Sequence, residues 1–522
     1  MTQLLDIFGF LSVLLRGLSF AFEALTVGGV IFTAVVARGT SLSRWVRCSA
    51  LLLAVTQICS LAASSTILVE STDLKLGEVV GAEFWCAGIL TVGGALTIAA
   101  FPRWRVLYPI ASLAILVGSA MMSHSSARLE HRWFLVPLTL MHHLAGAAWI
   151  GGLPYLLAAL RRNDGGAAAT ITVRFSRVAM ISVALLTGAG AALALTFVRY
   201  ASAAVETTYG VMLLAKVILT AILLLLGALN LNIVRAVRRG ATRDTLPLRR
   251  FAEAEIGIGF TVLLAAASLT STPPAVDVLA DRVSPEEISQ RMKPRWPRME
   301  TPSVAELSPA TPLSIPQISR LPGSFVPGQR QHPDTAADIA WSEYNHHWAG
   351  LMVLAIGLLA LLSRTFSWAR HWPLAFFGLA VFLLVRSDSE NWPLGPRGFW
   401  ESFQVAEVAQ HRVFVLLIVA FAVFEWAVQS NRIAPRRAAL VFPLVCATGG
   451  ALLMTHSHSL GNVKEEFLAE LSHIPLAILA IVAGWSRWLE LRLPGIRTRV
   501  AAWAWPVCFV LIGAVLILYR ES

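Results

Sequence analysis

Residues 209–235 read YGVMLLAKVILTAILLLLGALNLNIVR, a run in which Lys216 is the one charged side chain before the final arginine. A helix needs about 20 predominantly apolar residues to cross the roughly 30 Å hydrocarbon core of a bilayer. Similar stretches recur along the 522-residue chain, separated by short charged loops. The sequence therefore predicts an all-α, polytopic transmembrane helical bundle and excludes a soluble enzyme. Fourteen spans are expected, near residues 8–36, 48–69, 84–101, 105–122, 133–160, 178–198, 209–235, 252–271, 347–364, 371–386, 411–429, 438–455, 466–487 and 500–519.

The composition also fits a chain surrounded by lipid. Hydrophobic residues make up 56% of the chain, charged residues make up 14%, and the mean hydropathy is +0.66. The net charge of +11 comes from arginines scattered over the loops, so we expect the lipid bilayer, and no nucleic acid, as a partner. The sequence has no phosphate-binding glycine motif, and we expect no enzyme. Five cysteines without a C-x-x-C pair argue against a disulfide framework or a thiolate metal site.

A hydrophilic insert divides the expected spans into two groups. Residues 273–345 hold 12 of the 25 prolines, with mixed charge and little periodicity. This composition is typical of an extended, largely coil connector. The expected organisation is an eight-span domain at 1–272, the insert at 273–345 and a six-span domain at 346–522.

The charges of the loops predict the orientation. Loops rich in arginine and lysine are retained on the cytoplasmic side of a membrane. Basic residues concentrate in alternate loops, as at Arg161 and Arg162, while the opposite loops hold most of the acids, including Glu70 and Asp388. We therefore expect both termini and the insert on the outer side.

Most of the 12 histidines fall on this outer side. Neutral imidazole is the commonest transition-metal ligand, and helix ends at one level can converge on a single site. Methionines lie at the same level, and imidazole with thioether suits copper, with methionine favouring Cu(I). An alternative stays open, in which these amphipathic residues simply meet lipid headgroups. The candidate ligands for capture are His346, His347, His411, His456 and His458, with Met454 as a soft ligand.

Three histidines are expected deeper within their spans. At about 1.5 Å per residue, His142 and His143 lie roughly 15 Å below the outer surface, and His473 lies about 10 to 15 Å down. A buried ionisable group usually faces a polar interior or a pathway, although a neutral histidine bonded to a neighbouring helix is the alternative. Adjacent helical residues point about 100° apart, so one of the pair can be a ligand, and we favour His143. The candidates for a deeper relay are His124, Met122, His143 and His473.

The first span carries two charged residues on one face. Arg16 and Glu23 are seven residues apart, which is close to two helical turns. Two interpretations stay open: a structural ion pair, or groups that relay protons or repel a cation.

The stretch His143-Leu-Ala-Gly-Ala-Ala-Trp149-Ile-Gly151-Gly152 resembles the signature helix of the copper resistance protein D family, a histidine followed by small residues and Trp-x-Gly-Gly. The seventh span, from Tyr209 through Lys216 to Asn230, is also similar to that family. The resemblance covers roughly residues 1–272, and the last six spans resemble C-terminal extensions fused to some members. It implies a multi-pass protein of the bacterial inner membrane that handles periplasmic copper. With the orientation expected from the loop charges, both termini lie in the periplasm.

The expected function is thus binding of a copper ion at the periplasmic face, followed by import or relay. A periplasmic copper carrier is a candidate partner, and the sequence sets no oligomeric state. One alternative is a haem-binding electron-transfer protein, because paired histidines can ligate haem. Another is a non-transporting factor that delivers copper to an oxidase or a carrier.

Overall fold

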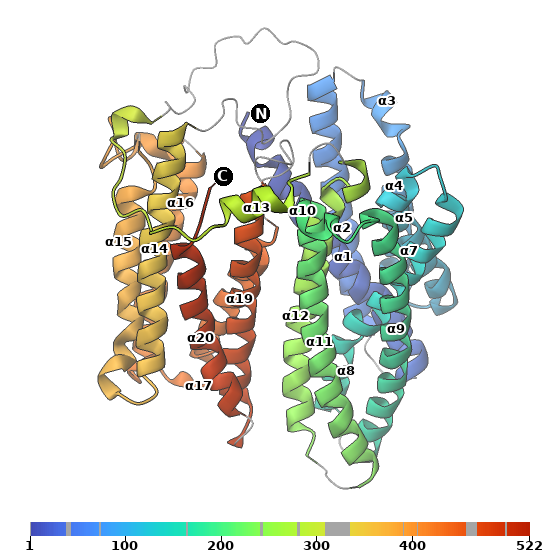
Figure 1. Ribbon diagram of the computed structural model, residues 1–522. Helices are drawn as coiled ribbons and strands as arrows, with labels where there is room; N and C mark the ends of the chain where they lie inside the picture. The colour runs from blue at the N-terminus through green and yellow to red at the C-terminus, as the bar shows by residue number, and fades with distance from the viewer. Residues whose placement is uncertain are drawn as a thin grey trace. The chain divides into compact units, whose positions relative to one another are not determined.

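The described chain is helical throughout its regular structure. Within the described ranges the computed structural model contains no β-strand (Figure 1). Without water in the hydrocarbon, each backbone polar group needs a partner inside its own segment, which helices provide. The structure describes residues 2–37, 43–72, 75–162, 165–240, 244–278, 282–307, 335–389, 391–404, 406–455, 467–495 and 498–521.

Contacts divide the chain into two units. The N-terminal unit comprises Leu4–Arg282 with Met454–Leu460. The C-terminal unit comprises Met1–Gln3, Val283–Leu453 and Gly461–Ser522. The division therefore falls inside the segment expected as an insert.

Twelve described helices are long and apolar enough to cross a membrane. The expected spans near 105–122 and 438–455 form shorter apolar helices, Arg105–Met121 and Val441–Leu453. In the first of these, a 3-10 turn precedes the α-helix and shortens it. The multi-pass helical architecture is confirmed, while the count of fourteen spans and the orientation of the termini stay predictions.

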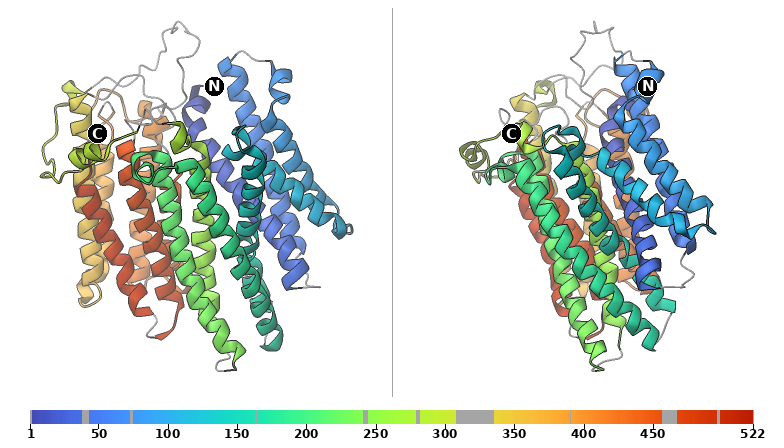
Figure 2. Two further views of the ribbon diagram at one scale, coloured as in Figure 1. Left: turned by 45° about the vertical axis from the view of Figure 1, so that its right-hand side comes forward. Right: turned by 90° about the vertical axis from the view of Figure 1, so that its right-hand side faces the viewer.

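The N-terminal unit is built from long helices that pack against their sequence neighbours. Among them α11 and α12 lie side by side (Figure 2). The elements are α1 (Thr2–Ile31), η1 (Phe32–Val36), α2 (Ser43–Thr72), α3 (Leu76–Val80), α4 (Glu83–Ala100), η2 (Arg105–Leu107), α5 (Tyr108–Met121), α6 (His124–Ala127), α7 (Arg132–Gly146), η3 (Ala147–Gly151), α8 (Leu153–Arg162), α9 (Gly165–Val198), α10 (Ala203–Glu206), α11 (Thr208–Arg238), α12 (Leu246–Ser271) and η4 (Ala275–Asp277).

The C-terminal unit has a core of aromatic side chains. Trp372, Phe442 and Trp505 are buried, and their rings lie 5.3 to 5.6 Å apart between centroids. Its elements are α13 (Pro285–Arg291), η5 (Val304–Glu306), α14 (Ala336–Leu362), η6 (Ser367–Ala375), α15 (Phe376–Arg386), η7 (Glu401–Gln404), α16 (Ala406–Gln429), α17 (Pro435–Ala438), α18 (Val441–Leu453), α19 (Phe467–Arg492) and α20 (Thr498–Ile517).

The expected insert contains short helices as well as coil. In α13, the side chain of Ser284 accepts a hydrogen bond from the backbone N–H of Glu287, and Pro285 opens the first turn. This is a favourable helix start even in a proline-rich segment. Further along, α14 begins at Ala336, ahead of the expected boundary at residue 346.

One carboxylate joins three helical segments of the C-terminal unit. Glu490 of α19 accepts hydrogen bonds from Arg364 just beyond α14, at 2.5 and 3.2 Å. It also accepts from Arg487 at 2.6 Å and from the indole of Trp505 in α20 at 2.8 Å. Charge-assisted bonds of this kind are about twice as strong as neutral ones, so Glu490 holds these helix ends together.

The Trp-x-Gly-Gly stretch has a clear packing role. Residues Ala147–Gly151 form the π-helix η3, which packs against α1. A Cβ atom on Gly151 would lie 1.9 Å from the carbonyl oxygen of Ala24, and one on Gly28 would lie 2.2 Å from that of Ala147. Glycine is therefore required on both sides of this backbone contact, as in close packing of membrane helices.

We expect Gly151→Ala to destabilise the protein by about 1 to 3 kcal/mol, because the added methyl group must push α1 away. The measurement is thermal unfolding of the purified protein in detergent. Gly188→Ala is the matched control, since a Cβ at Gly188 meets nothing within 4 Å. Equal unfolding temperatures for the two variants would contradict the close contact.

Candidate functional site

His143 lies in a polar contact between three helices of the N-terminal unit. Its Nδ1 atom is 3.2 Å from Glu23 Oε1 on α1 and 3.2 Å from Ser119 Oγ on α5. Glu23 is only 5% exposed, and Phe20, one turn away on α1, packs edge-on against the imidazole. With Glu23 ionised, Nδ1–H donates to the carboxylate, which leaves the lone pair on Nε2.

This arrangement is typical of the outer shell of a metal site. A histidine that ligates a metal usually donates its other ring N–H to a carboxylate or carbonyl, which fixes the tautomer and raises ligand basicity. Glu23 provides such an acceptor for His143. The position of Nε2, on the far side of the ring, suits it to bind a metal.

His142 faces a different neighbour. Its ring packs against α9, where a Cβ on Gly190 would lie 3.1 Å from His142 Cε1. Its Nδ1 atom is buried and has no hydrogen-bond partner within the described part of the chain. The two adjacent histidines thus point to different helices, and the choice of His143 as ligand stays a prediction.

Met122 follows the last residue of α5, in the same region. Its sulfur accepts a hydrogen bond from Gln57 Nε2 at 3.4 Å. Met122 follows Ser119 by three residues, so the two share one side of α5 at its last turn. A thioether therefore lies about one turn beyond the level at which Ser119 meets His143.

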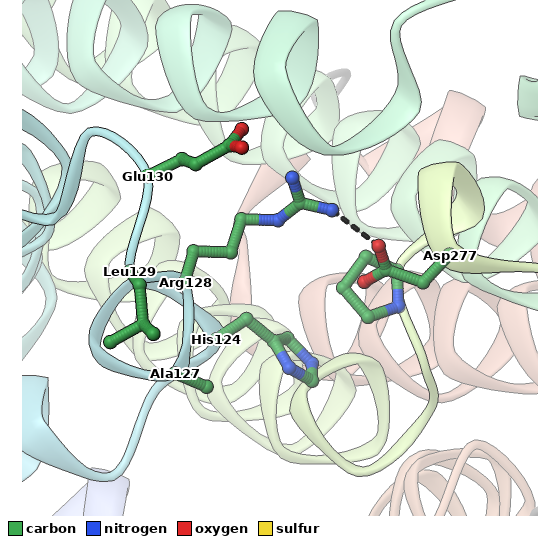
Figure 3. A pocket seen from close by; sticks show the side chains of 7 residues that line it. His124, Ala127, Arg128, Leu129, Glu130 and Asp277 are labelled. Atoms are coloured by element: carbon green, nitrogen blue, oxygen red, sulfur yellow. Dashed lines mark hydrogen bonds and ion pairs between the residues drawn. The ribbon is translucent and has the colours of Figure 1, made fainter.

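His124, which begins α6, borders a cavity of about 400 Å³ (Figure 3). Arg128 and Asp277 form an ion pair beside the imidazole, and the Glu130 side chain lies on the other side of Arg128. His124 Nε2 is buried without a hydrogen-bond partner among the residues that the structure describes. Burial, assisted by the positive charge of Arg16, lowers the pKa of His124. The imidazole is therefore neutral at neutral pH, as a metal ligand must be.

In the C-terminal unit, His411 is paired with a carboxylate as well. His411 Nδ1, at the start of the expected span, lies 2.9 Å from Asp388 Oδ1, and Ser387 donates to the same carboxylate at 2.8 Å. Burial acts to raise the pKa of Asp388, but the hydrogen bond and charge of His411 outweigh it and lower that pKa. The ionised carboxylate orients His411 as Glu23 orients His143.

His346, His473 and Tyr519 form an aromatic cluster. The His346 ring stacks on Tyr519 at 3.9 Å and lies 6.2 Å from the ring of His473, at right angles to it. His346 Nδ1 is 2.9 Å from the carbonyl oxygen of Ser342, to which it donates, so the lone pair is on Nε2. Two expected ligands that are 127 positions apart in the chain are thus close together.

His347 has partners on both ring nitrogens. Its Nδ1 accepts from the backbone N–H of Arg298 at 2.7 Å, and its Nε2 lies 3.0 Å from the carbonyl oxygen of Tyr519. In the other tautomer, Nε2 accepts from Arg520 at 3.3 Å. The side chain is fully buried, at 0% exposure, so binding of a metal would require breaking one of these contacts.

Among the described candidates, the structure brings His346 and His473 close together. Within the described ranges, no group of three or more histidine, cysteine or acidic side chains is close enough to hold a metal ion. Met454 is buried, and its carbonyl oxygen accepts from Ser268. His456 and His458 lie outside the described residues. The ligand roles of all ten candidates stay predictions.

The sequence did not identify the partners of these histidines. Glu23 drew attention as a charge within a span, and Asp388 only as one of several outer acids. Ser119, Gln57 and Tyr519 carry no sequence signal, because a contact between distant helices leaves no local pattern.

Comparisons with known proteins confirm the family resemblance. Residues 169–269, which run from α9 to α12, match the family model of Copper resistance protein D (CopD). The chain is also 29% identical over 163 residues to the Copper transport protein CutJ of Bacillus subtilis (strain 168). This alignment covers 30% of the chain and 29% of the relative. The CopD match does not include His143, and no solved structure matches the chain.

Proposed function

We propose that this chain is a membrane protein of the copper resistance protein D family that binds copper at its periplasmic side and relays it inward through the N-terminal unit. The observation that carries the proposal is the contact between His143 and Glu23, a half-buried imidazole held by a buried carboxylate. The proposed location is the bacterial inner membrane, with both termini in the periplasm. The cargo is a copper ion, and the proposed role includes no enzymatic step.

The chemistry of the N-terminal candidates supports copper. His124 and His143 offer imidazole nitrogens, and Met122, two residues before His124, offers a thioether. Nitrogen and thioether donors suit copper, whereas calcium and magnesium prefer oxygen. Glu23 adds a negative charge that offsets the charge of a bound cation in a low-dielectric environment.

The candidates also lie at successive depths. His124 borders the cavity at the start of α6, and Met122 lies at the end of α5. His143 is 11 residues into α7, or roughly 16 Å from its first residue at about 1.5 Å per residue. This order supports a relay from His124 past Met122 to His143.

The C-terminal unit supplies further proposed positions for copper. His346 with His473, and His411 oriented by Asp388, are the described candidates. His347, His456, His458 and Met454 complete the predicted set. A periplasmic copper carrier is the partner that we propose for delivery.

We expect His143→Ala to reduce the copper bound per purified chain, and Glu23→Gln to weaken binding by roughly 10- to 100-fold, as for other outer-shell partners. The measurement is titration of Cu(I) against a chromophoric Cu(I) chelator. His131→Asn is the matched control, because His131 is exposed and asparagine tolerates its positive φ of 60°.

Unchanged stoichiometry and affinity in both His143→Ala and Glu23→Gln would refute the His143 site. Size-exclusion profiles and helical circular dichroism equal to those of the parent protein establish that the variants are folded. An absorption spectrum of the same preparation tests the haem alternative, since a Soret band without bound copper would favour it.

We expect proteoliposomes that contain the protein to accumulate copper, and those with His143→Ala to lose most of this uptake, because the relay lacks its deepest N-terminal ligand. Uptake is measured as copper retained inside washed vesicles. Copper bound by the protein without any accumulation would contradict the relay and favour a delivery factor.

A further inference from the structure

A second cavity of the N-terminal unit lies between α2, α3 and α4. It has a volume of about 710 Å³. Leu61 of α2 and Ile89 of α4 are among its largely apolar lining, and Gly93 lies at one end. A Cβ on Gly93 would meet nothing within 4 Å, so the backbone borders open space there. We call this cavity the α2–α4 groove.

The groove has the depth of one bilayer leaflet. On α2 its lining extends from Ile58 to Glu70, which is roughly 18 Å at about 1.5 Å per residue. Half of the hydrocarbon core is roughly 15 Å thick. Both α2 and α4 are candidate spans, and Ile58 and Ile89 are more than half exposed in the protein alone. At this depth a spanning helix is surrounded by lipid acyl chains, and an apolar groove can bind one of them.

The interior of the groove offers little to a polar ligand. The indole N–H of Trp85 donates to Ser65 Oγ at 2.9 Å, which links α4 to α2 across the groove wall. Thr66 donates its hydroxyl to the carbonyl oxygen of Ala62 in its own helix. With these groups satisfied, the interior suits a hydrocarbon chain.

The loop end of the groove is acidic. Glu70 lines it and is exposed, and α3, which follows α2 in the chain, carries Glu78 with Lys75 just before its first residue. Glu78 already has a hydrogen-bond partner, because its carboxylate accepts a hydrogen bond from the backbone N–H of Lys75 at 2.8 Å. The carboxylate that lines the groove is therefore Glu70, and it attracts an ammonium group and repels an anionic headgroup.

We propose that the α2–α4 groove binds one phospholipid with a primary-amine headgroup. Its acyl chain occupies the space between α2 and α4, and its ammonium group pairs with Glu70. The groove is separate from Glu23 and His143, so this proposal is independent of the copper proposal.

The test is native mass spectrometry of the full-length protein, incubated with phosphatidylethanolamine or phosphatidylglycerol of identical acyl chains. We expect phosphatidylethanolamine to be retained at least several-fold more than phosphatidylglycerol. Glu70→Gln should abolish this preference while keeping lipid bound, and Gly93→Phe should remove the bound lipid by filling the groove. Gly188→Phe is the matched control, because it places the same ring at another open position of a span.

Equal retention of the two lipids by the parent protein would overturn the proposal. Retention unchanged by Gly93→Phe would also overturn it. A dimer that Gly93→Phe abolishes would instead assign the groove to a second copy of this chain.

Discussion

A charge placed in hydrocarbon must find a partner within the protein, and this constraint explains the centre of the N-terminal unit. Glu23 on α1 and His143 on α7 are both in helical segments that are long and apolar enough to cross a membrane. Their contact, 3.2 Å long, satisfies the carboxylate and fixes the ring. An uncompensated buried carboxylate would be far more costly than the ordering of these two side chains. The same contact that stabilises the helices therefore prepares the imidazole for a cation.

The glycine contact between α1 and η3 keeps this pair in register. Gly28 lies five residues beyond Glu23, and Gly151 lies eight beyond His143, so the two backbones meet close to the polar pair. A side chain at either glycine would separate the helices that carry the carboxylate and the imidazole. The Trp-x-Gly-Gly stretch thus supports the candidate site through packing, although it contributes no ligand itself.

The sequence predicted the features that depend on local composition. Long apolar runs such as that ending at Arg235 give spans, and the depth of His143 follows from counting along its helix. Pairings depend on how helices pack, and Glu23 and His143 are 120 residues apart. Sequence reasoning therefore proposed a cluster of rim histidines, whereas the described residues show carboxylate and imidazole pairs. His347 illustrates the difference, because its neighbours come from Arg298 and Tyr519.

Tyr519 and Glu521 pack within the C-terminal unit. Tyr519 stacks on His346 and offers its carbonyl to His347, while Glu521 accepts hydrogen bonds from Ser342 and from the Tyr519 hydroxyl. Tyr519 thus packs beside His346 and His347. A chain shortened to end before Tyr519 would lose these contacts, and the packing of both imidazole rings would change.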